Sequence, residues 1–168
     1  MNARLLLLAA ASACCLMLTA HAQFPAEDNA AQSSAHRPDS VQFLFPDQIS
    51  IPAKKPNAVE LHFRVASGMH INSHTPHSKM LIATNLIVPE ASGMTVSTVD
   101  FPTGSDYSFA FSPNEKLSVY AGDFVLKATI AAQPGQHLLQ ALLRYQACDS
   151  NSCYPPKTIP VAMNVTAK

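Results

Sequence analysis

Hydrophobic and polar residues alternate along several short stretches of the chain. In residues 59–65, four apolar side chains from Val59 to Val65 alternate with polar or small ones. This two-residue period is typical of a β-strand that buries one face. The same period recurs over residues 124–130, 139–145 and 159–165, and weaker patterns predict strands over residues 41–45, 69–73, 81–88, 94–101 and 117–120.

Turn-forming residues separate these stretches. They lie at residues 52–57, 67–68, 89–93, 102–106, 112–114, 121–122 and 133–135. No stretch keeps a helical period for more than two turns. Eight or nine short strands at this spacing predict an all-β domain, an antiparallel β-sandwich over residues 41–168.

The first 22 residues have the pattern of a secretory signal peptide. Arg4 precedes an apolar run over residues 5–18, and an Ala-His-Ala sequence ends at Ala22. We predict cleavage after Ala22 and a periplasmic location. A lipoprotein with Cys14 at its N-terminus is a second interpretation. An uncleaved anchor is less favoured, because the run is shorter than the roughly 20 residues of a spanning helix.

Residues 23–40 form a polar segment with two prolines and no apolar period, which predicts a flexible tether. Two of the four cysteines, Cys14 and Cys15, leave with the signal peptide. The exported domain keeps Cys148 and Cys153 in an oxidising compartment.

Charge and motifs exclude several classes of function. Eleven Lys and Arg balance eleven Asp and Glu, so the chain lacks the basic field that nucleic-acid binding needs. It has no glycine-rich phosphate loop, no Gly-x-Ser-x-Gly elbow and no convincing carboxylate pair. We therefore predict no nucleic-acid partner, no cofactor and no small-molecule substrate.

The cysteines lie in the string YQACDSNSCYPP at residues 145–156. Four polar turn-forming residues separate them, so the sulfurs can approach to disulfide distance across a tight loop. Closing so small a loop stabilises a fold by about 2 kcal/mol, against nearly 5 for a loop of ~100 residues. A bond in a short polar loop is also accessible to an attacking thiolate. Spacing alone leaves a structural and a redox-active disulfide both open.

The motif around the cysteines resembles a known family. RYQAC at residues 144–148, followed by CYPP at residues 153–156, resembles the active-site segment of the N-terminal periplasmic domain of DsbD, the thiol:disulfide interchange protein. SGMHINSH at residues 67–74 and LSVYAG at residues 117–122 also resemble that family. The resemblance implies an immunoglobulin-like β-sandwich whose cysteines cycle between dithiol and disulfide.

The resemblance also implies roles for individual residues. Cys153 is expected to form the mixed disulfide with a partner, and Cys148 to resolve it. The predicted rim of the site consists of Tyr145, Gln146, Tyr154, Pro155 and His70. Ordinary strand-end packing is the alternative for the tyrosines and the proline. Asp149 is expected to disfavour a nearby thiolate, so strong acidification of either thiol is not predicted.

Members of the family cover their disulfide with a cap loop that carries an aromatic residue. The corresponding stretch here is residues 106–112, with Tyr107, Phe109 and Phe111 as candidates. The alternative for each phenylalanine is a core position on an edge strand.

A cluster of thioether and imidazole side chains permits a second hypothesis, a copper site. Its members are Met69, His70, His74, His77 and Met80. The histidines would share a face only on a helix, which Pro76 disfavours. The family resemblance explains the first part of this segment without a metal, so we predict none.

The predicted function is an electron relay outside the cytoplasm. The family implies that this domain takes electrons from a thioredoxin-like domain supplied by a membrane reductase and passes them to periplasmic redox proteins. We expect the donor to be a separate polypeptide. The alternative is a non-catalytic β-sandwich whose stable disulfide braces a binding surface.

Overall fold

The computed structural model describes residues 39–44 and 48–168, and these residues form strands, turns and loops without a helix. No helix in this part of the chain is long and apolar enough to cross a membrane. The predicted signal peptide and the predicted tether up to residue 38 lie outside the described residues. Ser40 is already buried, and its carbonyl accepts a hydrogen bond of 2.9 Å from the N–H of Ala66.

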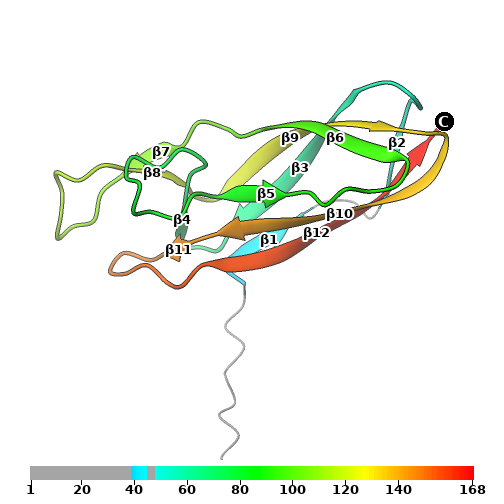
Figure 1. Cartoon of the computed structure of the whole chain (residues 1–168). Coiled ribbons are helices and arrows are strands. Elements are labelled where there is room, and N and C mark those ends of the chain that lie inside the picture. The colour runs from blue at the N-terminus through cyan, green and yellow to red at the C-terminus, as the bar shows by residue number, and fades with distance from the viewer. Residues whose placement is uncertain (1–38, 45–47) are drawn as a thin grey trace, which may run out of the picture. The chain divides into compact units, whose positions relative to one another are not determined.

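Two four-stranded sheets make up the larger part of the domain (Figure 1). The first sheet has the order β1 (Val41–Phe43), β3 (Asn57–Val65), β9 (Asp123–Ala132) and β6 (Met94–Asp100), and all its pairs are antiparallel. The second has the order β2 (Gln48–Ile51), β12 (Lys157–Ala167), β10 (Gly135–Tyr145) and β5 (Asn85–Ile87). Its pairs are antiparallel except β2 with β12, which is parallel.

The inner faces of these two sheets share one hydrophobic core. From the first sheet it includes Leu61, Phe63, Leu126 and Ile130, and from the second Leu139, Leu143, Val161, Met163 and Val165. Each such side chain contributes about 1.5–3 kcal/mol when fully buried. The predicted sandwich thus follows from strands that turn alternate residues inward.

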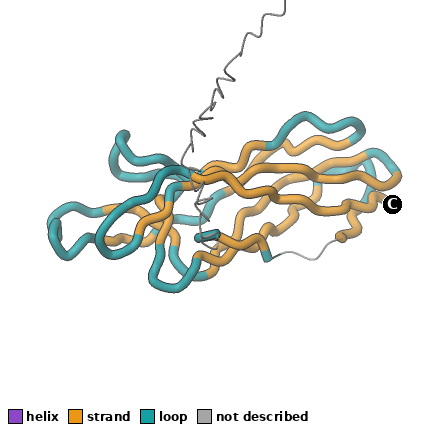
Figure 2. The backbone as a smooth tube through the Cα atoms, turned by 90° about the horizontal axis from the view of Figure 1, so that it is seen from below, coloured by secondary structure: helices purple, strands orange, loops and turns teal. Residues whose placement is uncertain are grey.

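A third sheet carries the cysteine segment at one end of the domain. Its order is β11 (Ala147–Cys148), β4 (His70–Asn72), β8 (Leu117–Tyr120) and β7 (Ser105–Tyr107), with antiparallel pairs throughout. In Figure 1 this sheet lies opposite the end that holds β2 and the C-terminus. Figure 2 shows the longest loops gathered at the same end.

The two faces of the third sheet have different surroundings. Ile71, Ala147 and Tyr120 belong to the shared hydrophobic core. His70 and Cys148 alternate with them along their strands and are also buried, but they point to the other face. The side chain of Cys148 is therefore buried on the face of the third sheet that points away from the core.

The strand predictions are correct in type for all nine stretches, with differences at the ends. Within residues 81–88 only Asn85–Ile87 forms a strand. The sequence predicts a turn over residues 102–106, but this is wrong at its end because Ser105 begins β7. The described residues contain three strands that the pattern does not predict: β2, β7 and β11. These have two to four residues, too few to show a period.

Candidate functional site

The two cysteines form a disulfide across a tight loop. Their Cα atoms are 3.9 Å apart. The N–H of Asp149 donates to the carbonyl of Ser152 at 2.9 Å, and the N–H of Tyr154 donates to the carbonyl of Ala147 at 2.8 Å. Backbone hydrogen bonds thus close the hairpin on both sides of the sulfurs. The four-residue spacer permits the bridge that the sequence predicts.

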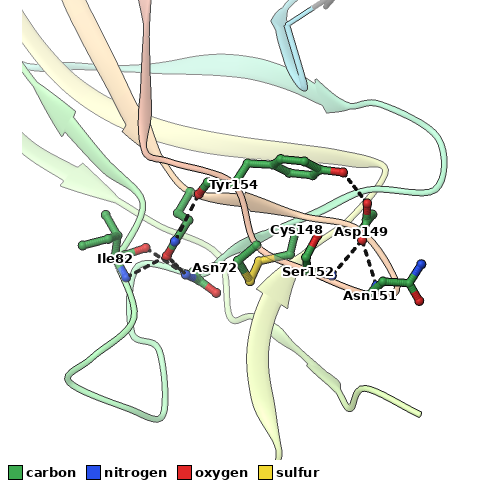
Figure 3. Close-up of a disulfide and its surroundings, with 9 residues drawn as sticks. Asn72, Ile82, Cys148, Asp149, Asn151, Ser152 and Tyr154 are labelled. Atoms are coloured by element: carbon green, nitrogen blue, oxygen red, sulfur yellow. Dashed lines mark hydrogen bonds between the residues drawn. A yellow bond between two sulfur atoms is a disulfide. The ribbon is translucent and has the colours of Figure 1, made fainter. Parts of the chain in front are cut away.

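The side chain of Asp149 organises this loop (Figure 3). Its Oδ1 accepts hydrogen bonds from the N–H groups of Asn151 at 2.8 Å and Ser152 at 2.9 Å. Its Oδ2 accepts a hydrogen bond from the hydroxyl of Tyr154. An aspartate that binds the amides two and three residues ahead stabilises a turn locally. The carboxylate therefore fixes the loop and joins it to the segment that follows Cys153.

The two sulfur-bearing residues differ sharply in exposure. Cys148 is 0% exposed, whereas Cys153 is exposed. Exchange begins with a thiolate that reaches one sulfur of the disulfide in line with the bond, so access decides which sulfur is attacked. A protein thiolate arriving from solvent meets Cys153.

Gln146 and Asn72 form a polar network behind the disulfide. The amide nitrogen of Asn72 donates to Oε1 of Gln146 at 3.1 Å and to the carbonyl of Ile82 at 3.1 Å. The N–H of Ile82 also donates to Oε1 of Gln146, and Nε2 of Gln146 donates to the carbonyl of Tyr154 at 3.2 Å (Figure 3). The network joins three segments around the site. Gln146 is among the predicted rim residues, whereas Asn72 is not, and its signal is an amide inside a buried strand.

The aromatic residues of the predicted cap loop stack outward from His70. The ring centroid of Tyr107 lies 4.0 Å from that of His70, and the centroid of Phe109 lies 5.9 Å from it. Phe111 stacks on Phe109 at 4.8 Å and is 69% exposed. His70 is the register partner of Cys148 across β4 and β11. Tyr107 and Phe109 are thus connected to the cysteine through His70.

His70 is a buried imidazole in an unusual setting. Burial lowers its pKa below the ordinary 6.5, and the carboxylate of Asp149 acts weakly in the opposite direction. Among the described residues, its buried Nε2 has no hydrogen-bond partner. Leaving a buried polar group unpaired costs about 1–3 kcal/mol. Burial therefore favours the neutral form of the imidazole.

The remaining rim residues lie in different places. Tyr145 is 0% exposed at the end of β10, which matches the strand-end packing alternative. Burial raises its pKa, and the Asp39 carboxylate raises it further. Tyr154 is half-buried and Pro155 is exposed on the segment after Cys153.

The histidines of the hypothetical copper cluster contact other groups. The ring of His74 stacks on Phe101 at 3.9 Å, and its Nδ1 lies 2.9 Å from the carbonyl of Thr84. Nδ1 of His77 lies 3.1 Å from the carbonyl of Lys116. Met80 is 91% exposed. In residues 39–44 and 48–168, no group of three or more His, Cys, Asp and Glu is arranged to hold a metal.

Comparison with known proteins places this geometry in a family. The family described as "Thiol:disulfide interchange protein DsbD, N-terminal" matches residues 40–164. The chain belongs to the DsbD N-terminal domain family. Its predicted immunoglobulin-like, all-β fold is confirmed. Family membership, together with the bonded cysteines, supports thiol-disulfide exchange at Cys148 and Cys153.

One similar solved structure is the reduced form of the DsbD N-terminal domain of Neisseria meningitidis. It is 19% identical and covers 66% of this chain and 79% of the other, with a TM-score of 0.43. No curated protein matches the chain.

Proposed function

We propose that the domain relays electrons through Cys148 and Cys153 between a thioredoxin-like protein, supplied by a membrane reductase, and other periplasmic redox proteins. Family membership supports exchange with thioredoxin-like proteins. The observation that carries the proposal is the exposed Cys153 bonded to the buried Cys148 in a short polar loop. A disulfide kept only for stability gains little from so short a loop.

Reduction of the domain proceeds in two exchanges. A thiolate of the donor attacks Sγ of Cys153, the bond between the two cysteines breaks, and its electron pair leaves on Cys148. A second thiolate of the donor then attacks the donor sulfur that is bonded to Cys153. This breaks the mixed disulfide and releases Cys153. The donor ends as a disulfide and the domain as a dithiol. The reverse sequence passes the two electrons to a disulfide of the acceptor.

The aromatic stack regulates access in this proposal. Tyr107 and Phe109 pack on His70 of β4, and Phe111 stacks on Phe109 and is exposed to a docking partner. Phe109 is the best lid candidate, because its ring contacts those of His70, Tyr107 and Phe111. Docking displaces the stack from His70 and so opens the side of the disulfide at the buried Cys148, while Cys153 is exposed already.

The proposed location is the periplasm, where the family's domain resides. Cleavage of the signal peptide after Ala22 would leave Cys148 and Cys153 as the cysteines of the mature protein. Lipid attachment at Cys14 is the alternative form of export. Mass spectrometry of the protein purified from the periplasmic fraction distinguishes the two, because cleavage after Ala22 gives an N-terminus at Gln23.

The decisive experiment is the reduction potential of the Cys148–Cys153 pair. The mature protein is equilibrated with thiol buffers of defined potential, and free thiols are counted by alkylation. We expect a potential within the range of exchanging proteins, above the roughly −300 mV that marks structural disulfides. A bond reduced only when the domain unfolds would contradict the relay and leave the stapled binding module.

Partners are then trapped with a Cys148→Ala variant. Its Cys153 forms a mixed disulfide that cannot be resolved, so a thioredoxin-like partner remains attached on a non-reducing gel. Cys153→Ala is the matched control and traps nothing if Cys153 is the attacked sulfur.

A further inference from the structure

Besides its bond to Cys153, Cys148 lies opposite a histidine on the neighbouring strand. Cys148 and His70 are direct register partners in the antiparallel pair of β11 and β4. Side chains at such positions point to the same face, with Cβ atoms about 4.5–5.5 Å apart. Both residues are buried, at 0% and 4% exposure. The imidazole and the sulfur therefore share one enclosed space on the face away from the core.

One ring nitrogen of His70 has no hydrogen-bond partner among the described residues while the disulfide is intact. Nε2 of His70 is buried and accepts or donates no hydrogen bond among the described residues. A disulfide sulfur carries no proton to offer. Reduction changes this, because the thiol of Cys148 is then a donor directly opposite the ring. Only the reduced protein has a thiol proton at Cys148. The unpaired Nε2 of His70 can accept that proton.

The groups around His70 are consistent with proton acceptance. The rings of Tyr107 and Phe109 pack on the imidazole, with centroids 4.0 and 5.9 Å away. Asp149, next to Cys148 on the following loop, is the carboxylate that acts on the imidazole. The negative charge of Asp149 stabilises the protonated form of His70, whereas burial favours the neutral form.

We propose that His70 is a proton acceptor for Cys148 and so activates the resolving cysteine. The inference rests on the proposed function, because it assigns a role within thiol-disulfide exchange.

The step begins when Cys153 is joined to the sulfur of a protein acceptor that entered as a disulfide. The proton of the Cys148 thiol moves to Nε2 of His70, and the thiolate attacks Sγ of Cys153. The bond between Cys148 and Cys153 forms, while the bond from Cys153 to the acceptor breaks. The electron pair leaves on the acceptor sulfur, which takes up a proton as His70 returns to neutral. The domain loses two electrons and the acceptor gains them.

The test follows the ionisation of Cys148 in a Cys153→Ser variant by the ultraviolet absorbance of its thiolate as pH is varied. With His70 present we expect two coupled steps, because thiol and imidazole titrate as a pair. Adding His70→Phe keeps a ring against Tyr107 but removes the acceptor. We then expect a single step and about tenfold less thiolate at neutral pH, equivalent to a pKa higher by about one unit.

A matched control and a second variant guard against an effect of packing alone. His62→Phe changes a histidine on β3 whose side chain is 45% exposed, and it is expected to leave the Cys148 titration unchanged. His70→Gln keeps a polar side chain if the phenylalanine variant fails to fold, and it too should abolish the second step. Identical titration curves with and without His70 would overturn the assignment.

The titration needs no exchange partner, so it separates this inference from the relay. If the intact disulfide resists reduction in the folded domain but the two coupled steps appear, the relay fails and the pairing of His70 with Cys148 stands. If the disulfide exchanges readily and the curves coincide, the relay stands and the role of His70 fails.

Discussion

Cys153 is exposed, whereas Cys148, the residue bonded to it, is fully buried. We expect the two thiols of the reduced protein to react at different rates. Cys153 in a Cys148→Ser variant should be alkylated at least about tenfold faster than Cys148 in a Cys153→Ser variant, because access of the reagent limits the reaction. Stopped alkylation followed by mass spectrometry measures both rates. Equal rates in the folded proteins, and a common rate in denaturant, would contradict a shielded Cys148.

The second prediction concerns the predicted cap loop, residues 106–112. Phe109→Ala should raise the rate at which a small dithiol reduces the disulfide by severalfold, because it removes the ring that contacts His70 and Tyr107. Phe111→Ala is the control, since that side chain is 69% exposed and its loss uncovers less. Reduction followed by thiol release gives both rates. An unchanged rate for Phe109→Ala would remove it as the lid.

The loop aspartate gives a third prediction. Asp149→Ala should lower the free energy of unfolding by about 1–3 kcal/mol, because two amides and the Tyr154 hydroxyl lose their acceptor. Asp149→Asn keeps an acceptor oxygen and should cost less. Chemical denaturation of the oxidised proteins measures the difference. A loss no greater for Ala than for Asn would mean that the carboxylate does not hold the loop.

Gly104 is packed too closely to accept a side chain, which is the basis of the fourth prediction. A Cβ there would clash with Oγ of Ser118 and lie 2.8 Å from Cβ of Ser73, two residues that are buried and hydrogen-bonded to each other at 2.8 Å. Gly104→Ala should destabilise the domain by about 1–3 kcal/mol. Adding Ser118→Ala removes the nearest atom and should recover part of the loss. Ser105→Ala, at an exposed position nearby, should stay within about 0.5 kcal/mol of the wild type.

Acidification provides the fifth prediction. The pKa of His70 is lower in the folded domain than its ordinary 6.5, so the unfolded chain binds more protons below that value. Stability should therefore fall as pH drops below about 6.5 and be regained above it. Denaturation curves of wild type and His70→Gln across this window test it, with the wild type expected to lose more. Parallel curves would show that His70 does not couple to folding.

The sequence predicts the long strands well, because their alternation reflects burial of one face. Residues 59–65 lie within Asn57–Val65, and residues 159–165 lie within Lys157–Ala167. It misses β7, because Ser105 and Asp106 are polar and follow a proline, which is also the composition of a turn. That strand exists through its pairing with β8, a tertiary contact that no local pattern records.

The site could be predicted from its motif only in part. The disulfide, Gln146 and the aromatic loop follow from the resemblance, and the structure brings them to one region. The motif does not separate Tyr145, which is buried in the core, from Tyr154, which reaches the loop. The role of Asp149 as acceptor for loop amides also differs from the electrostatic effect expected of it. Side-chain direction within a short loop depends on hydrogen bonds that residue type alone does not fix.

The parallel pairing of β2 with β12 limits the order in which parts of the domain can fold. The side chain of Gln48 donates to Thr166, 118 positions further along the chain, and β12 also forms the long pair with β10. The second sheet therefore cannot close until residues 164–167 have met β2, and contacts so distant in sequence slow folding. The cysteines are separated by only five positions, so their pairing does not depend on a distant part of the chain. After export, the cysteines can therefore be oxidised before the sheets have formed, so the disulfide can precede the hairpin that holds it in the folded domain.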